Sequence, residues 1–424
     1  MSSVPLSLLP DGAEVSPDGR LSIAGCDVLA LAATFGTPLF VYDEAHLRAR
    51  CREAVAAFGA GNVVYATKAF LCLAMARLVH EEGLLLDVAT GGEMHVALAA
   101  GVPGDRLVLH GNNKSLAELA TALTVGVHHV VVDSFDELDR LEQLHADGYP
   151  VPRVQLRITP GIEAHTHEYV RTGQADSKFG FGLTGGVAER AIDRAQRSSA
   201  VELVGLHTHI GSQIFAAESF AMAADVMAPL VAAHQLPTLT LGGGLGVAYV
   251  EGESAPAIAE WGKVVREALD ATGLQAQLLV EPGRAIVAGA AVTLYTVGTV
   301  KEIPGIRTYV AVDGGMSDNP RPVLYGSGYE AFLPRRTDAE RERPVRIVGK
   351  HCESGDVLVH EAFLPADLSV GDILCTPVTG AYGHTMASNY NKVPRPAVLF
   401  VAGGQARVVA RRETYDDLTR LDVG

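Results

Sequence analysis

Short apolar runs alternate with longer segments of helical period along the first two thirds of the chain. The runs are rich in Val, Ile and Leu, and most are followed by an Ala- and Glu-containing segment such as SLAELATALTVG. Near-continuous apolar strands that alternate with helices are typical of parallel sheets whose faces are covered. Eight strands are predicted in this way, at residues 63–68, 84–89, 107–112, 129–134, 154–159, 203–211, 238–244 and 278–284.

The number of these strand–helix units indicates the architecture. Eight units over roughly 240 residues favour a (β/α)8 barrel of the TIM type. An open doubly wound sheet is the competing arrangement. In a barrel, the carboxyl ends of all strands converge on one face, and the catalytic groups sit on that face.

Polar residues and glycines gather at the carboxyl ends of the predicted strands. They are Lys68, Asp87, His110, Asn112, Asp133, Arg157, His207, His209, Gly242 to Gly244, Glu281 and Arg284. A single one of them is most simply a strand terminator, because Asp, Asn and Gly also start turns. Their joint occurrence at strand ends predicts a functional site on one face of the barrel.

The pattern changes after Arg284, where short strands follow one another with turn residues between them and little helical period. These strands are predicted at 292–303, 307–315, 344–352, 356–364, 371–380, 397–404 and 406–412. Such a succession predicts a second, β-rich domain. The opening segment, residues 21–43, precedes the barrel and fits a pairing with either part.

Composition narrows the function classes. A chain of 424 residues that is 48% hydrophobic and 20% charged is expected to be globular, with two domains. Its net charge of −15 argues against nucleic-acid binding, which needs clustered Lys and Arg. No apolar run approaches the roughly 20 residues of a membrane span, and the first residues do not resemble a signal peptide. The five cysteines are widely spread without a CxxC pair, which predicts a cytoplasmic protein without disulfides or structural zinc.

One lysine ends the first predicted barrel strand, in the stretch NVVYATKAF at residues 62–70. Lysine is rarely buried without a partner, so Lys68 needs an explanation. It could form a structural ion pair with Asp87, or hold a substrate phosphate or carboxylate. It could also be a Schiff-base nucleophile whose pKa is lowered by its surroundings. Lys68 by itself does not distinguish these three interpretations.

Three other strand-end motifs change the balance. LGGGLG at 241–246 offers bare backbone amides to a phosphate, and HIGSQ at 209–213 adds a hydroxyl. EPGR at 281–284 combines a carboxylate, a rigid turn and a cation. A phosphate cradle, a Schiff-base lysine, a flat imidazole and a carboxylate together fit pyridoxal phosphate. The carboxylate would keep the pyridine nitrogen protonated, so that the ring can accept electrons.

Longer blocks of the sequence resemble the signatures of one enzyme family. They are VVYATKAF, HGNNKS, HTHEYVRTGQADSKFGFG, GLHTHIGSQIF, LGGGLGVAY, EPGRAIVAGA, VDGGMSDNPRPVLYG, KHCESGD and TGAYGHTMASNYN. In order, and over nearly the whole chain, they are similar to diaminopimelate decarboxylases, of the alanine-racemase-like, fold type III pyridoxal-phosphate enzymes. The resemblance implies a barrel at 39–285 that binds pyridoxal phosphate. It also implies a β-sandwich or β-barrel domain from 1–38 and 286–424, which contributes to the substrate site and to the interface of a homodimer.

The resemblance assigns one set of residues to the cofactor. These are Lys68, His209, Ser212, Gly244, Glu281, Pro282, Gly283, Arg284 and Tyr382. Lys68 would hold pyridoxal phosphate as a Schiff base, and His209 would stack on the pyridine ring. Glu281 would contact the pyridine nitrogen, and Ser212, Gly244 and the EPGR turn would bind the phosphate.

A second set is assigned to the substrate, an amino acid. These residues are Arg284, Arg321, Tyr325, Glu353 and Tyr382. The arginines and Tyr325 would hold carboxylate, for which bidentate Arg contacts are strong. Glu353 would recognise the distal amino group. Cys352 would donate the proton, reaching across the dimer interface, so that the two chains share their active sites.

The implied reaction is the decarboxylation of meso-2,6-diaminopimelate to L-lysine and carbon dioxide, the last step of lysine biosynthesis. The family acts at the D-configured centre, so the arginines and Glu353 would recognise the distal L-centre. Related decarboxylases take ornithine, lysine or carboxynorspermidine, and these substrates stay open. A non-catalytic regulatory homologue should have lost Lys68, Glu281 or Cys352, and this chain has all three.

Two further enzyme classes compete with this interpretation. A racemase of the same fold would carry an arginine in place of Glu281. A metal-dependent hydrolase could use His207 and His209 as ligands. Individual residues also have simpler explanations: Cys352 as an inert thiol, Arg284 as a brace of the barrel rim, and His165 and His167 as organisers of a loop.

Overall fold

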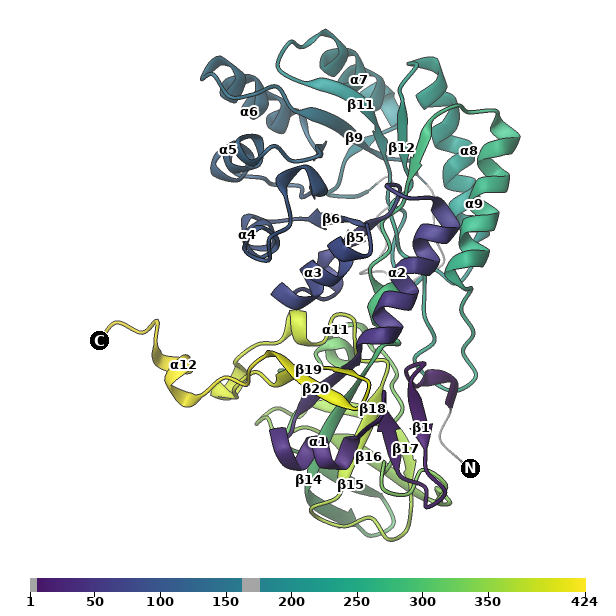
Figure 1. Cartoon of the computed structure of the whole chain (residues 1–424), viewed down its shortest axis with the longest axis vertical. Coiled ribbons are helices and arrows are strands. Elements are labelled where there is room, and N and C mark those ends of the chain that lie inside the picture. The colour runs from purple at the N-terminus through teal and green to yellow at the C-terminus, as the bar shows by residue number, and fades with distance from the viewer. Residues whose placement is uncertain (1–5, 162–175) are drawn as a thin grey trace. The chain divides into compact units, whose positions relative to one another are not determined.

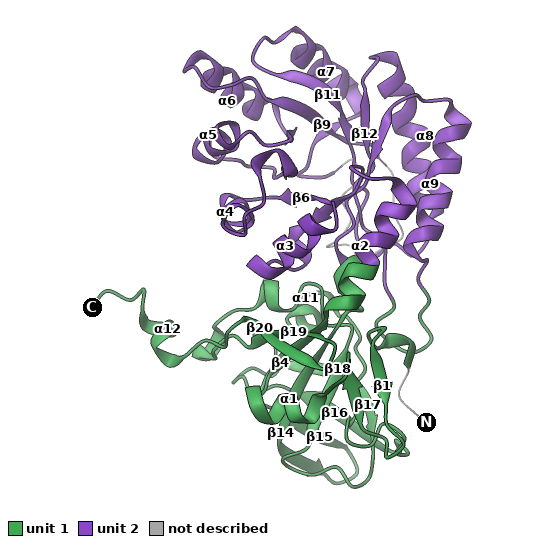
Figure 2. Ribbon diagram, viewed as in Figure 1, with its two compact units in different colours: residues 1–49, 248–254, 286–424 green, residues 50–247, 255–285 purple. Residues whose placement is uncertain are grey.

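The computed structural model describes residues 6–161 and 176–424. The chain divides into two compact units (Figure 2). The barrel unit comprises residues 50–247 and 255–285, and the β unit comprises residues 1–49, 248–254 and 286–424. Among the described residues, no helix has both the length and the apolar character needed to cross a membrane.

Eight parallel strands form the sheet of the barrel unit (Figure 1). They are β5 (Val64–Ala66), β6 (Leu85–Val88), β7 (Leu107–Leu109), β8 (His129–Val132), β9 (Arg153–Thr159), β11 (Glu202–His207), β12 (Thr238–Thr240) and β13 (Gln277–Leu279). Each strand pairs with the next one in this order. A short strand, β10 (Phe181–Gly182), adds to β9. All eight predicted strands are confirmed; β9 is one residue longer than its predicted range, and the other seven strands are shorter than theirs.

The two edges of this sheet meet. Val63 and Val280 form a parallel bridge, and the Val64 N–H donates to the Val280 carbonyl at 2.8 Å. The Ala66 N–H donates to the Pro282 carbonyl at 3.2 Å, which continues the pairing toward the carboxyl ends. The predicted (β/α)8 barrel is therefore confirmed, and the open doubly wound sheet is wrong.

Helices follow the strands and flank the barrel (Figure 1). They are α3 (Leu73–Glu81), α4 (Gly91–Ala99), α5 (Leu116–Val125), α6 (Phe135–Ala146), α7 (Val187–Arg197), α8 (Glu218–Ala233) and α9 (Ile258–Thr272). The starts of α4, α5 and α6 are fixed by side-chain caps from Thr90, Ser115 and Ser134, each of which accepts a backbone N–H three residues later. These caps lie close behind the strands, so the strand-end residues are held on short connections.

The β unit contains a mixed sheet with the strand order β17-β16-β15-β14-β4-β19-β20, and β18 also pairs with β14. Its strands are β4 (Leu39–Asp43), β14 (Ala291–Ile303), β15 (Arg307–Val312), β16 (Arg343–Val348), β17 (Val357–Leu364), β18 (Ile373–Pro377), β19 (Ala397–Ala402) and β20 (Gln405–Ala410). The seven predicted strands after residue 291 are confirmed. A small antiparallel sheet holds β1 (Ala13–Val15), β2 (Leu21–Ile23) and β3 (Cys26–Asp27).

The opening segment supplies the strand β4 to this sheet. β4 pairs antiparallel with β14 and parallel with β19, and all five of its residues are buried. Residues 39–49, expected in the barrel range 39–285, therefore group with the β unit. Helix α2 (Glu44–Phe58) begins in the β unit and continues into the barrel unit. The shorter helices are α1 (Val28–Phe35), α10 (Arg284–Val287), α11 (Arg321–Tyr325) and α12 (Tyr415–Thr419).

Candidate active site

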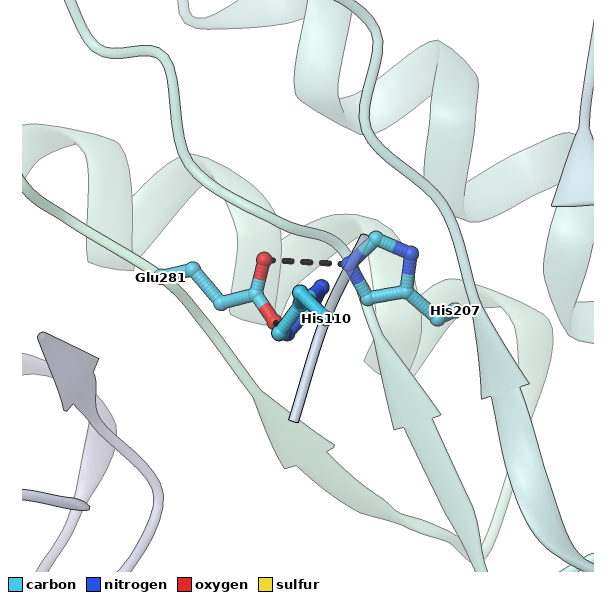
Figure 3. Close-up of side chains that lie close together, drawn as sticks. All are labelled: His110, His207 and Glu281. Carbon is cyan, nitrogen blue, oxygen red and sulfur yellow. Dashed lines mark hydrogen bonds and ion pairs between the residues drawn. The ribbon is translucent and has the colours of Figure 1, made fainter. Parts of the chain in front are cut away.

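Two histidines, His110 and His207, form a buried cluster with Glu281 at the carboxyl end of β13 (Figure 3). Nε2 of His207 lies 3.0 Å from Oε2 of Glu281 and forms a hydrogen bond with it. Nε2 of His110 lies 3.0 Å from Oε1, at ion-pair distance but without hydrogen-bond alignment. The three residues are 1%, 6% and 7% exposed for His207, His110 and Glu281, so water screens their charges little.

Burial and charge set the protonation of this cluster. Burial by itself would raise the pKa of Glu281, but His207 and His110 outweigh it and hold that pKa well below its usual value. Burial lowers the pKa of His207 to about 4, so this ring is neutral at pH 7. Burial would also lower the pKa of His110, but the carboxylates of Asp87 and Glu281 raise it above its ordinary value.

Lys68 lies immediately after β5, in a single 3-10 turn at Thr67–Ala69. Its side chain is exposed, and among the described residues it forms no ion pair. Asp87 is engaged elsewhere: its backbone carbonyl accepts the Thr67 hydroxyl at 2.6 Å, and its carboxylate lies 3.9 Å from Nε2 of His110. The interpretation of Lys68 as a structural ion-pair partner of Asp87 is therefore wrong, and its amino group is accessible for chemistry.

The glycines of LGGGLG allow three strand ends to approach one another closely. A Cβ atom on Gly242, Gly243 or Gly244 would lie 2.7, 1.9 or 2.0 Å from the backbone oxygens of Thr208, Glu281 and Gly211, respectively. Such distances are far inside van der Waals contact, so no larger residue fits without a backbone shift. The glycine run therefore serves the packing around Glu281, and it also leaves the loop backbone bare.

The HIGSQ and EPGR motifs come together at the same end of the barrel. Nη2 of Arg284 donates to the hydroxyl of Ser212 at 3.1 Å, and the Arg284 side chain is buried. His209 accepts a hydrogen bond at Nδ1 from the Gly243 N–H at 3.3 Å. Burial and the charge of Lys68 lower the pKa of His209, so its ring is a neutral, flat surface.

Three residues of the β unit that are assigned to the substrate, Arg321, Tyr325 and Tyr382, are buried or half-buried. Arg321 begins α11 and is 4% exposed; its Nη1 donates to the Tyr329 hydroxyl at 2.5 Å. Its guanidinium carbon lies 4.1 Å from the ring centroid of Tyr249, a cation–π distance. Tyr325, at the end of α11, and Tyr382 are half-buried, and Tyr382 adopts a left-handed backbone conformation with φ +57°.

Cys352 and Glu353 lie in an exposed loop of the β unit. Buried neighbours anchor this loop: Nδ1 of His351 lies 2.7 Å from Oδ2 of Asp356, which also accepts the His351 N–H at 2.9 Å. The Cys352 N–H donates to Oδ1 of Asn391 at 3.0 Å. The loop backbone is therefore fixed, while the side chains of Cys352 and Glu353 stay accessible.

The arrangement does not favour a hydrolase with His207 and His209 as metal ligands. His207 is directed at Glu281, and His209 is bonded to the backbone of Gly243. The ligand atoms of His110, His207 and Glu281 lie within 4.8 Å of one another, a group of types that can bind a metal, but here they pair with each other. His165 and His167 lie outside the described residues.

Sequence reasoning gave His110 and His207 no role toward the cofactor. The available signal was their position, since His207 is the last residue of one apolar barrel strand and His110 directly follows another. Their convergence on Glu281 depends on the closed barrel and is not visible in any local motif.

The barrel residues fit a pyridoxal group. Oε1 of Glu281 is buried and has no hydrogen-bond partner in the described part of the chain, so it is available to the N–H of a pyridinium ring. The amino group of Lys68 is accessible, and Ser212 and Arg284 lie together beside the glycine run. A (β/α)8 barrel with these residues at its carboxyl ends, joined to a β unit, defines a barrel-type pyridoxal-phosphate enzyme.

Comparisons with known proteins agree. The model of the family "pyridoxal-dependent decarboxylase, pyridoxal binding domain" matches residues 44–288. Diaminopimelate decarboxylases of Mycobacterium tuberculosis and Bacillus subtilis are 48% and 46% identical, each over 96% of this chain and 95% of its own length. The crystal structure of diaminopimelate decarboxylase from M. jannaschii in co-complex with L-lysine is 31% identical, with a TM-score of 0.91 and 98% of each chain covered. The chain belongs to the pyridoxal-dependent decarboxylase family.

Proposed function

We propose that the protein decarboxylates meso-2,6-diaminopimelate to L-lysine and carbon dioxide, the last step of lysine biosynthesis. The observation that carries this proposal is the identity of 48% and 46%, over nearly the full length, to the diaminopimelate decarboxylases of Mycobacterium tuberculosis and Bacillus subtilis. The chain also retains Lys68, Glu281 and Cys352, which a non-catalytic homologue would have no need to keep.

The cofactor is held by the barrel residues. When bound, pyridoxal phosphate supplies an electron sink for the Cα–carboxylate bond that breaks. Lys68 would provide the amino group for its covalent attachment, and the neutral ring of His209 would offer a flat surface to the pyridine ring. Glu281 keeps a proton on the ring nitrogen, and its ionised state, held by two histidines, supports this role. Ser212, Gly244 and the turn at Pro282 to Arg284 bind the phosphate.

The substrate is held by Arg284, Arg321, Tyr325, Glu353 and Tyr382, of which Tyr382 also contacts the cofactor. The guanidinium of Arg321 is already oriented by Tyr329 and Tyr249, so little side-chain entropy is lost when it binds a carboxylate. Glu353 is exposed and accessible to a distal ammonium group.

Two copies of the chain form a dimer with shared active sites. Cys352 of one copy donates the proton to Cα in the site that contains Lys68 of the other copy. The exposure of Cys352, on a loop whose backbone is anchored, supports a role toward a second chain. The five cysteines are all free thiols, which supports a cytoplasmic location.

The test is a substrate comparison. Purified protein supplied with pyridoxal phosphate is incubated with meso-diaminopimelate, ornithine, arginine or carboxynorspermidine, and carbon dioxide and amine products are measured. We expect lysine from diaminopimelate and at least tenfold slower turnover of the other compounds. Lys68→Ala is the inactive control.

The possible outcomes test the substrate, the decarboxylase activity and the class of enzyme separately. Faster turnover of another amino acid would overturn the substrate but keep the decarboxylase. No turnover of any of them would overturn the activity, and hydrolytic activity that appears only with zinc would favour the metal-dependent alternative.

A further inference from the structure

The cluster around Glu281 is built from strands that are not neighbours. His110 follows β7, His207 ends β11 and Glu281 follows β13, and other strands separate each pair in the barrel order. Side chains from such strands can meet only inside the closed barrel (Figure 3). The cluster is therefore held by the barrel as a whole, and neither histidine is a local support of its own strand.

The two histidines contact the carboxylate in different ways. His207 makes an aligned hydrogen bond from Nε2 to Oε2, so Nε2 carries the hydrogen. Its Nδ1 is buried with no partner in the described part of the chain, as expected of a neutral ring. Nε2 of His110 lies equally close to Oε1 but is not aligned for a hydrogen bond, and it also approaches Asp87 at 3.9 Å.

We infer that His207 and His110 are positioning residues with separate tasks: His207 orients the carboxylate of Glu281 as a neutral hydrogen-bond donor, and His110 stabilises its negative charge as a cation. Oε1 is thereby left as the acceptor for the N–H of the cofactor ring. This inference rests on the proposed function, because it takes the partner of Oε1 to be the pyridine nitrogen.

Because the two histidines have different tasks, Gln and Leu substitutions should affect them differently. The Nε2 group of Gln can replace the Nε2–H donor of His, but Gln carries no charge. His207→Gln should therefore keep the function of His207, and His207→Leu should lose it. His110→Gln and His110→Leu should be equally impaired, because both remove the cation.

The measurement is a ratio of affinities and does not need catalysis. Each protein is freed of cofactor, and dissociation constants are determined for pyridoxal phosphate and for its analogue in which carbon replaces the ring nitrogen. The ratio of the two dissociation constants reports the contact made by the ring nitrogen. If a variant is partly unfolded, both constants change by the same factor, so the ratio is unaffected. Glu281→Gln sets the value without the contact, and His128→Gln, which changes the histidine just before β8, is the matched control.

We expect the wild-type protein, His128→Gln and His207→Gln to prefer pyridoxal phosphate by about tenfold or more. His207→Leu and both His110 variants should lose most of that preference and resemble Glu281→Gln. If all four histidine variants keep the wild-type ratio, the inference is overturned and the proposed function stands. If His207→Gln fails like His110→Gln, the division of tasks is overturned. A wild-type protein that binds both ligands equally would overturn the assignment of Glu281, and one that binds neither would overturn the proposed function itself.

Discussion

At the scale of single residues, two lysines in the connections that follow barrel strands show how the surroundings of a side chain determine its role. Lys114 is 2% exposed, and its ammonium lies 2.7 Å from Glu137 and donates to the carbonyls of Gly111 and Val131. Lys68 is exposed and has no ion pair among the described residues. A buried lysine with every donor engaged is structural, whereas an accessible one beside the cluster of Glu281 is available to react.

We predict opposite consequences for these two lysines. Lys68→Ala should remove the visible absorption of the attached cofactor and abolish decarboxylation, with little change in melting temperature. Lys114→Met should keep the absorption but lower stability by about 3 kcal/mol, because it leaves the buried Glu137 unpaired. Absorption spectra and thermal melts of both variants test this. A Lys68→Ala protein that is still yellow, and whose colour is removed by borohydride as in the wild type, would contradict the role of Lys68.

At the scale of elements, the strand ends are fitted to each other so closely that glycine is required. Gly243 follows β12, and a Cβ atom there would lie 1.9 Å from the carbonyl oxygen of Glu281. The backbone that carries the carboxylate of Glu281 is therefore in direct contact with the glycine loop. Packing of the loop and position of the carboxylate cannot be changed independently.

We predict that Gly243→Ala damages both stability and cofactor binding. The added methyl group must displace the backbone at Glu281, which should lower the free energy of unfolding by about 1 to 3 kcal/mol, as overpacking typically does. The matched control is Gly92→Ala, in the first turn of α4, where a Cβ atom meets nothing closer than 3.7 Å. That variant should be neutral or stabilised by up to about 1 kcal/mol. Equal melting temperatures and cofactor affinities for the two variants would argue against the packing explanation.

A buried carboxyl group in the β unit makes its stability depend on pH. Asp318 accepts the Tyr295 hydroxyl at 2.6 Å and the Gly315 N–H at 2.8 Å. Burial, with the nearby charges of Asp356 and Asp313, raises the pKa of Asp318 to about 7 despite these hydrogen bonds. The folded protein then binds a proton that the unfolded chain releases near pH 4.

The sign of this effect follows from proton linkage. Between about pH 4 and pH 7 the folded state binds more protons than the unfolded state at this residue, so stability falls as pH rises, by at most about 1.4 kcal/mol per unit. Asp318→Asn cannot titrate, so its melting temperature relative to the wild type should rise across this range. Thermal melts at a fixed cofactor concentration measure the difference. A constant difference from pH 5 to 7 would mean that Asp318 does not titrate there.

At the scale of the whole molecule, the opening segment is built into a sheet whose other strands come from the far end of the chain. Strand β4 lies between β14 and β19; it pairs with β14 over residues 39–42 and with β19 along its whole length. The sheet of the β unit is therefore complete only when residues 39–43 lie between strands from the far end of the chain. The exposed loop of Cys352 belongs to this unit and depends on its integrity.

The proposed dimer with shared active sites predicts complementation between two inactive proteins. Lys68→Ala and Cys352→Ala should each be nearly inactive. After subunit exchange, half of the dimers are mixed, and each mixed dimer carries both lesions in one site and none in the other. About a quarter of the wild-type activity should return, because random pairing leaves one intact site in half of the dimers. No recovery after exchange, verified by mass spectrometry, would show that each chain completes its own site.

Features that depend on residues close together in the chain could be predicted from the amino-acid sequence. Apolar period predicted the eight barrel strands and the seven later strands, because burial on one or both faces acts residue by residue along a strand. The motifs at strand ends likewise identified Lys68, Ser212, Glu281 and Arg284 as candidates for one site.

Which of these residues contact one another depends on the tertiary structure. Glu281 is 74 residues from His207 along the chain, and their contact exists because the barrel closes between Val63 and Val280. The placement of β4 beside β14 and β19 is equally long-range, and its apolar run fits a barrel strand as well as a central strand of the β unit. Local pattern sets what a segment can become, but the partner of a strand and the neighbour of a buried charge are chosen by packing and electrostatics across the whole chain.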